Sequence, residues 1–199
     1  MRASTYPIML LLSILTLSSC KKDDNPANPS PTSQEILPLK AGNTWVFRVT
    51  GFDTTGTVTG TGGSFSIVIG KDTVIGNDTW HQFQSNNSFL TNKPDGVWLM
   101  QTGASPVAPA LYYKYPANVG DSLSWSTFQV SVYSNNISVT VPLGTYSCYQ
   151  YRNTYNSISI EDDYLAPGIG FIAIDSYSIT ASGREYCAAK LSLVSVTIK

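Results

Sequence analysis

The sequence has few of the residues on which enzyme chemistry depends. It contains a single histidine, His81, three cysteines, and only 13% charged residues among 199. It has no G-x-S-x-G nucleophile turn, no C-x-x-C pair and no G-x-x-x-x-G-K-[ST] phosphate loop. A formal net charge of −1 gives no basic surplus for neutralising phosphates, so no nucleic-acid partner is expected. The composition favours a binding protein over an enzyme and indicates no cofactor.

The sequence also lacks an apolar run long enough to span a bilayer, which needs ~20 residues. Its longest such run, from Ile8 to Leu17, has the length of a secretory signal core. The run ends in "LSSC" (17–20), which resembles the lipobox of bacterial lipoproteins. That resemblance implies a signal peptide over residues 1–19, cleavage before Cys20, and acylation of Cys20. An ordinary signal peptide that happens to end near a cysteine is the alternative.

The residues after Cys20 are those of a linker. Residues 21–35 hold three prolines and no large apolar side chain, so they cannot bury enough surface to offset the entropy of ordering. We therefore expect an acylated cysteine and disordered tether over residues 20–35, and one domain over residues 36–199. "KDD" (22–24) resembles an export signal for lipoproteins of the cell surface, and the solvated start of a linker explains it equally well. The expected location is the outer membrane, lipid-anchored, on the periplasmic face or at the cell surface.

From residue 37 onward the apolar residues recur with a period of two. Trp45, Phe47 and Val49 alternate with smaller or polar residues, and similar runs follow to the end of the chain. Turn residues separate these runs, at 76–78, 94–96, 135–136 and 182–183 among others. No window shows a helical stripe. The pattern predicts an all-β, single-domain antiparallel sandwich or barrel of about ten strands with little or no helix.

Four landmarks recur in a group of Gram-negative lipoproteins and periplasmic proteins of unknown function: "LPLKAGNTWVF", "YPANVGDSLSW", "VPLGTYSCYQY" and "YLAPGIGFI". The chain resembles that group from Leu37 to Lys199. The resemblance implies a strongly curved antiparallel sheet, a half-barrel or open barrel similar to that of lipoprotein carriers. It also implies that the concave face takes a lipophilic ligand. No catalytic residues are carried over.

The cysteine count becomes even if Cys20 carries lipid. Cys148 and Cys187 then remain, both in strand-like stretches and in a compartment where disulfides persist. A disulfide between them is the prediction. Two separate thiols acting as small apolar residues are the alternative.

Polar candidates for a site are few. Glu161, Asp162 and Asp163 are adjacent and predict a solvated acidic loop, with a calcium site as the alternative and no other metal site indicated. Successive strand residues face opposite ways, which argues against a catalytic carboxylate pair. His81 falls on the same face as Phe83 and is typical of a half-buried strand histidine. A hydrolase using His81 and the acidic run is the least favoured reading.

Aromatic residues are the most distinctive part of the composition, with 12 tyrosines and 4 tryptophans. Alternation places Tyr113 and Tyr115 on one side of a strand and Tyr112 on the other, one row in the core and one partly exposed. Together with Trp125 these are the candidate ligand-contact aromatics. The leading hypothesis is an envelope protein that binds a lipophilic ligand. Binding of glycan or protein through exposed aromatics, a structural accessory subunit, and plain aromatic packing are the alternatives.

Overall fold

The fold is a single antiparallel sheet of 12 strands, seen in a computed structural model that describes residues 35–84, 87–103, 107–125 and 127–199. The strands in chain order are β1 Thr44–Phe52, β2 Val58–Ile75, β3 Asp78–Phe83, β4 Ser88–Lys93, β5 Gly96–Gln101, β6 Val107–Lys114, β7 Ser122–Trp125, β8 Phe128–Val141, β9 Gly144–Tyr155, β10 Ile158–Ala166, β11 Gly170–Ile179 and β12 Glu185–Thr197. The all-β prediction is confirmed, with two strands more than expected. None of the described residues forms a helix that is long and apolar enough to cross a membrane.

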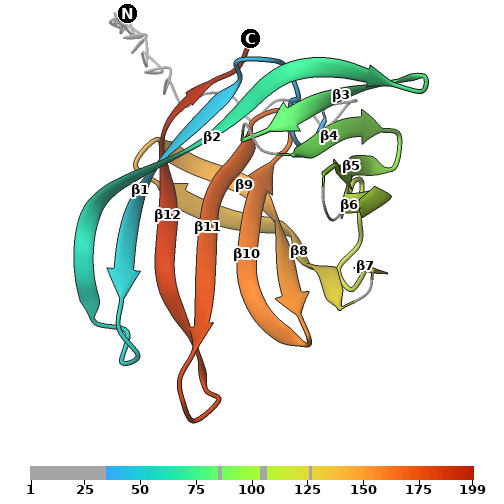
Figure 1. Cartoon of the computed structure of the whole chain (residues 1–199). Helices are drawn as coiled ribbons and strands as arrows, with labels where there is room; N and C mark the ends of the chain where they lie inside the picture. Colours follow the sequence, from blue (N-terminus) through green and yellow to red (C-terminus); the bar gives the residue numbers. More distant parts are fainter. Residues whose placement is uncertain (1–34, 85–86, 104–106, 126) are drawn as a thin grey trace, which may run out of the picture.

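The sheet curves almost into a closed barrel. Strands that are neighbours in the sequence pair, except β6 and β7, and β1 also pairs with β12, which gives the order β6-β5-β4-β3-β2-β1-β12-β11-β10-β9-β8-β7. The two end strands, β6 and β7, are consecutive in the chain and contact each other. β8 additionally contacts β11 and β12, and Figure 1 shows β8 and β9 crossing behind β10 to β12. The predicted curved sheet is thus an open barrel with one seam, between β6 and β7.

Strand β1 shows how the alternating pattern builds the core. Trp45 and Phe47 are fully buried, and the Trp45 indole Nε1 donates a hydrogen bond of 2.6 Å to the carbonyl oxygen of Ile169. At Gly170, which has a φ of +86°, a Cβ would lie 2.7 Å from Leu37 Cδ1 and 2.9 Å from the Trp45 ring. Glycine is therefore required here, because a side chain would push the Trp45 ring out of its place.

The residues just before β1 also belong to the core. Ile36 and Leu37 are buried, and Asn92 Nδ2 donates a hydrogen bond of 3.0 Å to the Leu37 carbonyl. The Gly168 amide donates to the Glu35 carbonyl at 2.8 Å. Full burial of one aliphatic side chain contributes about 1.5–3 kcal/mol, so these residues hold the start of the described chain firmly against the sheet. The domain boundaries drawn from the sequence remain predictions.

Three of the four predicted turns are confirmed, among them the one at 182–183 between β11 and β12, and one is wrong. Ile75 pairs with Asp78 across the turn at 76–77, and Lys93 pairs with Gly96 across the turn at 94–95. The expected turn at 135–136 does not exist, since β8 runs through it unbroken. The pairing of β8 with β9 shifts between Ser134 and Ile137, which absorbs the two asparagines as an irregularity of the strand.

Candidate functional site

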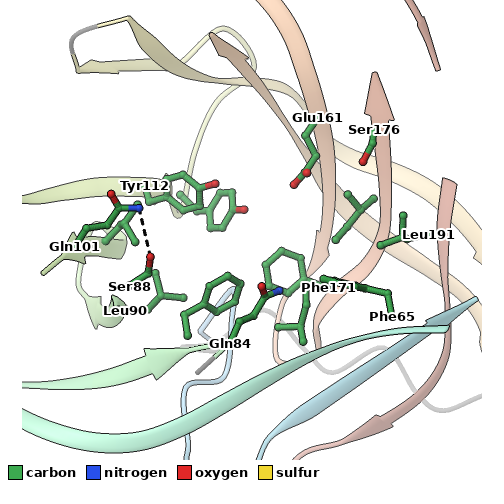
Figure 2. A pocket seen from close by; sticks show the side chains of 15 residues that line it. Phe65, Gln84, Ser88, Leu90, Gln101, Tyr112, Glu161, Phe171, Ser176 and Leu191 are labelled. Atoms are coloured by element: carbon green, nitrogen blue, oxygen red, sulfur yellow. Dashed lines mark hydrogen bonds between the residues drawn. The ribbon is translucent and has the colours of Figure 1, made fainter. Parts of the chain in front are cut away.

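A cavity of about 440 Å³ lies inside the curved sheet. Strands β2 to β6 line one side of it and β10 to β12 the other (Figure 2). Its lining residues are Phe65, Ile67, Phe83, Gln84, Ser88, Leu90, Leu99, Gln101, Tyr112, Tyr113, Glu161, Phe171, Ile174, Ser176 and Leu191. A volume of this size is within the range of small-molecule sites, roughly 300–1,000 Å³.

The walls of the cavity are mixed: large apolar and aromatic side chains alternate with the polar side chains of Gln84, Ser88, Gln101 and Ser176. Ile174 and Leu191 are direct partners across β11 and β12, and both line the cavity. The Phe171 ring lies 6.3 Å from Phe83 and 6.2 Å from Tyr113, so the aromatic rings of β3, β6 and β11 meet there. Such a surface favours an apolar ligand, since the ligand and the walls would both lose contact with water.

A pair of buried carboxyl groups enters this region from β10. Asp163 is fully buried, and its Oδ2 accepts hydrogen bonds of 2.6 Å from the Tyr113 hydroxyl and of 2.6 Å from Asn153 Nδ2. Glu161, two residues earlier, points the same way and is hydrogen-bonded to Asp163. The pairing follows from the strand period of two, which brings i and i+2 to one face.

This pair of carboxyl groups holds at least one proton at neutral pH. Burial, followed by the nearby Asp163 carboxylate, raises the pKa of Glu161 to about 10, so Glu161 is neutral and donates to Asp163. Burial also raises the pKa of Asp163, while the hydrogen bonds from Glu161, Tyr113 and Asn153 oppose that shift. In Figure 2 the Glu161 carboxyl group points into the cavity. None of the residues that line the cavity is basic.

Asp162, between these two, faces the opposite side of the sheet. Arg152 binds it through Nε at 2.7 Å and Nη2 at 2.6 Å, and the Tyr177 hydroxyl donates to it at 2.8 Å. The Arg152 guanidinium lies 4.2 Å from the Tyr133 ring centre and 5.7 Å from that of Tyr177. The hydrogen bonds from Arg152 to Asp162 raise the arginine's pKa further. This cluster stabilises the fold and leaves Asp162 no contact with the cavity.

The prediction of a solvated acidic loop at Glu161, Asp162 and Asp163 is therefore wrong. The three residues lie within β10, where Asp162 and Asp163 are 1% and 0% exposed. These residues are buried because β6, β9 and β11 cover them with hydrogen-bond donors. Those strands are distant in sequence, so no local sequence signal reveals the contacts. The calcium alternative gains no support, since no group of metal-ligating residues was found in the described part of the chain.

The four candidate aromatics divide into two places. Tyr113 is in the core at 2% exposure, while Tyr112 lines the cavity and lies 6.0 Å from the Trp125 ring. Tyr115 lies beyond the end of β6 and packs against Tyr149 at 5.2 Å. The structure thus brings Tyr112, Tyr113 and Trp125 to one region and leaves Tyr115 out of it.

His81 and the acidic run do not meet. The histidine pairs with Leu90 across β3 and β4, on the face of Phe83 as predicted, and its Nδ1 lies 2.8 Å from Asp72 Oδ1. Asp72 is half exposed and neither residue lines the cavity that Glu161 enters. The constellation that a hydrolase of this kind needs is not assembled.

The expected disulfide between Cys148 and Cys187 is not formed, and both cysteines are free. Cys148 lies on β9 and Cys187 on β12, with β10 and β11 between them in the sheet. Three strand spacings amount to about 14 Å, well beyond the ~7 Å that a bridged pair of Cα atoms allows. Burial raises the pKa of Cys148 to about 12, so this thiol is unreactive at neutral pH.

Several residues of the site carry no recognisable sequence signal. Asn153 is 1% exposed and holds Asp163, yet it lies in an ordinary strand run. Gln101 donates to Ser88 at 3.3 Å on the cavity wall and is equally inconspicuous in the sequence. The one available signal was the i, i+2 spacing of Glu161 and Asp163 within a run of strand-forming residues.

Cys20 and the "KDD" stretch lie outside the described residues, so acylation and export remain predictions.

No protein-family model matches the chain, and no curated protein matches it. Two solved structures resemble it. One is a "putative lipoprotein" from Parabacteroides distasonis, with 13% identity and a TM-score of 0.41, and this chain covers all of it with 83% of its own length.

The other is a "putative exported protein with YmcC-like fold" from Bacteroides fragilis, with 12% identity, a TM-score of 0.41 and the same coverage.

Proposed function

We propose that the protein is a lipid-anchored binding protein of the cell envelope that holds a small amphipathic molecule in the cavity of its sheet. The observation that carries this proposal is the cavity of about 440 Å³, lined by both apolar and uncharged polar side chains, with one neutral carboxyl group directed into it. The lipobox supplies the anchor, and residues 20–35 supply the tether.

The chemistry of the walls indicates an uncharged ligand with an apolar chain and a hydroxyl or amide group. The Glu161 O–H donates a hydrogen bond to Asp163, which leaves the carbonyl oxygen of Glu161 to accept a hydrogen bond from a ligand. An anionic group would meet no basic side chain on the lining and would lie near the Asp163 carboxylate. Desolvating a charge without a partner is costly, so a free carboxylate is disfavoured.

The test compares 1-dodecanoylglycerol with dodecanoate, which share a chain and differ in the charge of the head. The full chain carrying Cys20→Ser, which removes the acylation target, is titrated with each by calorimetry at neutral pH. We expect saturable one-to-one binding of the glycerol ester and at least tenfold weaker binding of dodecanoate. Equal binding of both would contradict the role given to the neutral carboxyl group.

A matched pair of variants locates the binding. Ser176→Phe places a ring in the cavity, because Ser176 lines it from β11. Ser195→Phe places the same ring at an exposed position of β12. We expect the first to abolish binding of 1-dodecanoylglycerol and the second to leave it unchanged, with thermal melting used to confirm that both variants fold.

A further inference from the structure

A second cavity adjoins the first one at the seam of the sheet. Its volume is about 270 Å³, and it is lined by Leu99, Gln101, Tyr112, Trp125, Phe128 and Tyr155. Leu99, Gln101 and Tyr112 line both cavities. The two spaces are therefore separated by the thickness of a few side chains on β5 and β6.

The seam itself is closed by aromatic rings in place of backbone hydrogen bonds. β6 and β7 are the two ends of the strand order and are not paired with one another in the described chain. The Tyr112 ring lies 6.0 Å from Trp125 and is stacked with Phe128 at 6.2 Å, and Trp125 lies 5.0 Å from Phe128. Rings can change rotamer without breaking a strand ladder, so this part of the wall opens at lower cost than any paired part.

Tyr112 is the residue that separates the two cavities. Burial, with smaller contributions from Asp163 and Glu161, raises the pKa of its hydroxyl far above the ordinary value, so the hydroxyl lies away from bulk water. Its ring nevertheless remains partly exposed, because it borders a cavity on each side. Figure 2 shows the Tyr112 side chain on the wall opposite Glu161.

We propose that the two cavities form one elongated site, in which the apolar chain of a bound amphipath runs from Glu161 past Tyr112 and through the β6–β7 seam onto Trp125 and Phe128. This inference rests on the proposed function and extends it. The ligand class is an uncharged amphipath whose chain is longer than the inner cavity alone can hold. Trp125 and Tyr112 then determine chain-length specificity.

A series of chain lengths tests the inference. The full chain with Cys20→Ser is titrated with octanoyl, dodecanoyl and hexadecanoyl glycerol. Binding is measured by displacement of a fluorescent probe, with each ester used below its critical micelle concentration. A fully buried methylene tightens binding about fourfold. We expect the gain to continue from dodecanoyl to hexadecanoyl, by at least tenfold in total. A hexadecanoyl ester that binds no tighter than the dodecanoyl ester would overturn the proposal.

Two variants assign that gain to the seam. Trp125→Ala removes one wall of the outer cavity, and Tyr112→Trp enlarges the side chain between the cavities. Each should weaken hexadecanoylglycerol at least tenfold and octanoylglycerol less than twofold. Trp98→Ala is the matched control, because Trp98 donates to Asp95 at 2.8 Å and lines neither cavity. An equal loss for all chain lengths in both seam variants would also overturn the proposal.

A spectroscopic readout reports the position of the chain end directly. Hexadecanoylglycerol brominated at its terminal carbon should quench a component of the tryptophan emission that is absent in Trp125→Ala. Octanoylglycerol brominated in the same way should not quench that component. Failure of every chain length to bind would reject the proposed function, whereas binding without length dependence or Trp125 quenching would reject only the elongated site.

Discussion

The two faces of β10 and its neighbours treat carboxyl groups in opposite ways. On the outer face, Asp162 is paired with Arg152 and accepts a hydrogen bond from Tyr177. On the inner face, Glu161 and Asp163 have no basic partner on the cavity wall and hold at least one proton between them. The two arrangements are one residue apart in the sequence. The difference shows that the environment of each carboxyl group in an acidic run depends on which face of the sheet its side chain occupies.

The same contrast separates stability from binding. The outer cluster satisfies all its charges and contributes to holding β8 to β11 together. The inner pair is costly to bury, and it places a carboxyl group on the wall of the cavity with no basic side chain beside it. The outer cluster therefore stabilises the sheet. The inner carboxyl pair lowers the stability of the fold but provides a polar group in the cavity.

Removing the Asp162 carboxyl group on the outer face should give a large loss in the free energy of unfolding. Asp162→Ala leaves Arg152 without its partner, and the arginine side chain retains only 25% exposure. We expect a loss of about 3 kcal/mol in the free energy of unfolding, measured with urea. Asp162→Asn keeps an acceptor for Tyr177 and should lose less. An unchanged midpoint for Asp162→Ala would show that the ion pair contributes nothing net.

A second effect, which appears only as a dependence on pH, concerns the inner pair. The pKa of Glu161 rises from about 4.3 in the unfolded chain to about 10 in the folded one. The folded state therefore binds more protons between these values, and stability falls as pH rises through this window. Glu161→Gln keeps a donor toward Asp163 and removes the titration. Its stability should fall less steeply with pH, by up to about 1.4 kcal/mol per pH unit.

The matched control for that pH dependence is Asp72→Asn, which changes an exposed carboxyl group beside His81. Parallel stability curves for the wild type and Glu161→Gln between pH 5 and 9 would contradict the proton assigned to Glu161.

The smallest expected effect is at the exposed rim of the outer cluster. Lys190 Nζ lies 3.5 Å from Asp175 Oδ2, and the lysine side chain is 52% exposed. We expect Lys190→Ala to change the free energy of unfolding by less than about 0.5 kcal/mol, because solvent and salt screen such pairs. A loss as large as that of Asp162→Ala would mean that the two faces of the sheet do not differ as described.

Much of the fold could be predicted from local pattern. The alternation around Trp45 and Phe47, and the turn residues at 76–77 and 94–95, identify strands and hairpins without knowledge of their partners. The asparagines at 135–136 misled the prediction because an irregularity within β8 and a turn use the same residue types.

The site could be predicted only in part, because its contacts are between distant strands. Alternation predicts Tyr112 and Tyr113 on opposite sides of the strand, and this prediction is wrong: both line the inner cavity, with their rings 4.3 Å apart. The pairing of β5 with β6 is irregular between Val97 and Trp98, which leaves Tyr112 as an extra residue and turns its side chain inward.

The Tyr113–Asp163 hydrogen bond joins residues 50 apart, so the buried state of Asp163 follows from closure of the sheet and not from its neighbours in sequence. The prediction of a disulfide between Cys148 and Cys187 was wrong for the same reason, since the distance between these residues is set by strand order.

The seam also bears on self-association. An unpaired strand edge is a template to which another chain can add a strand. In the described residues the two end strands of the sheet lie beside each other: β6 carries Pro109, which has no N–H to offer, and β7 spans only Ser122–Trp125. Because each edge is covered by the other, edge-to-edge pairing between copies of this domain is disfavoured even at high local concentration.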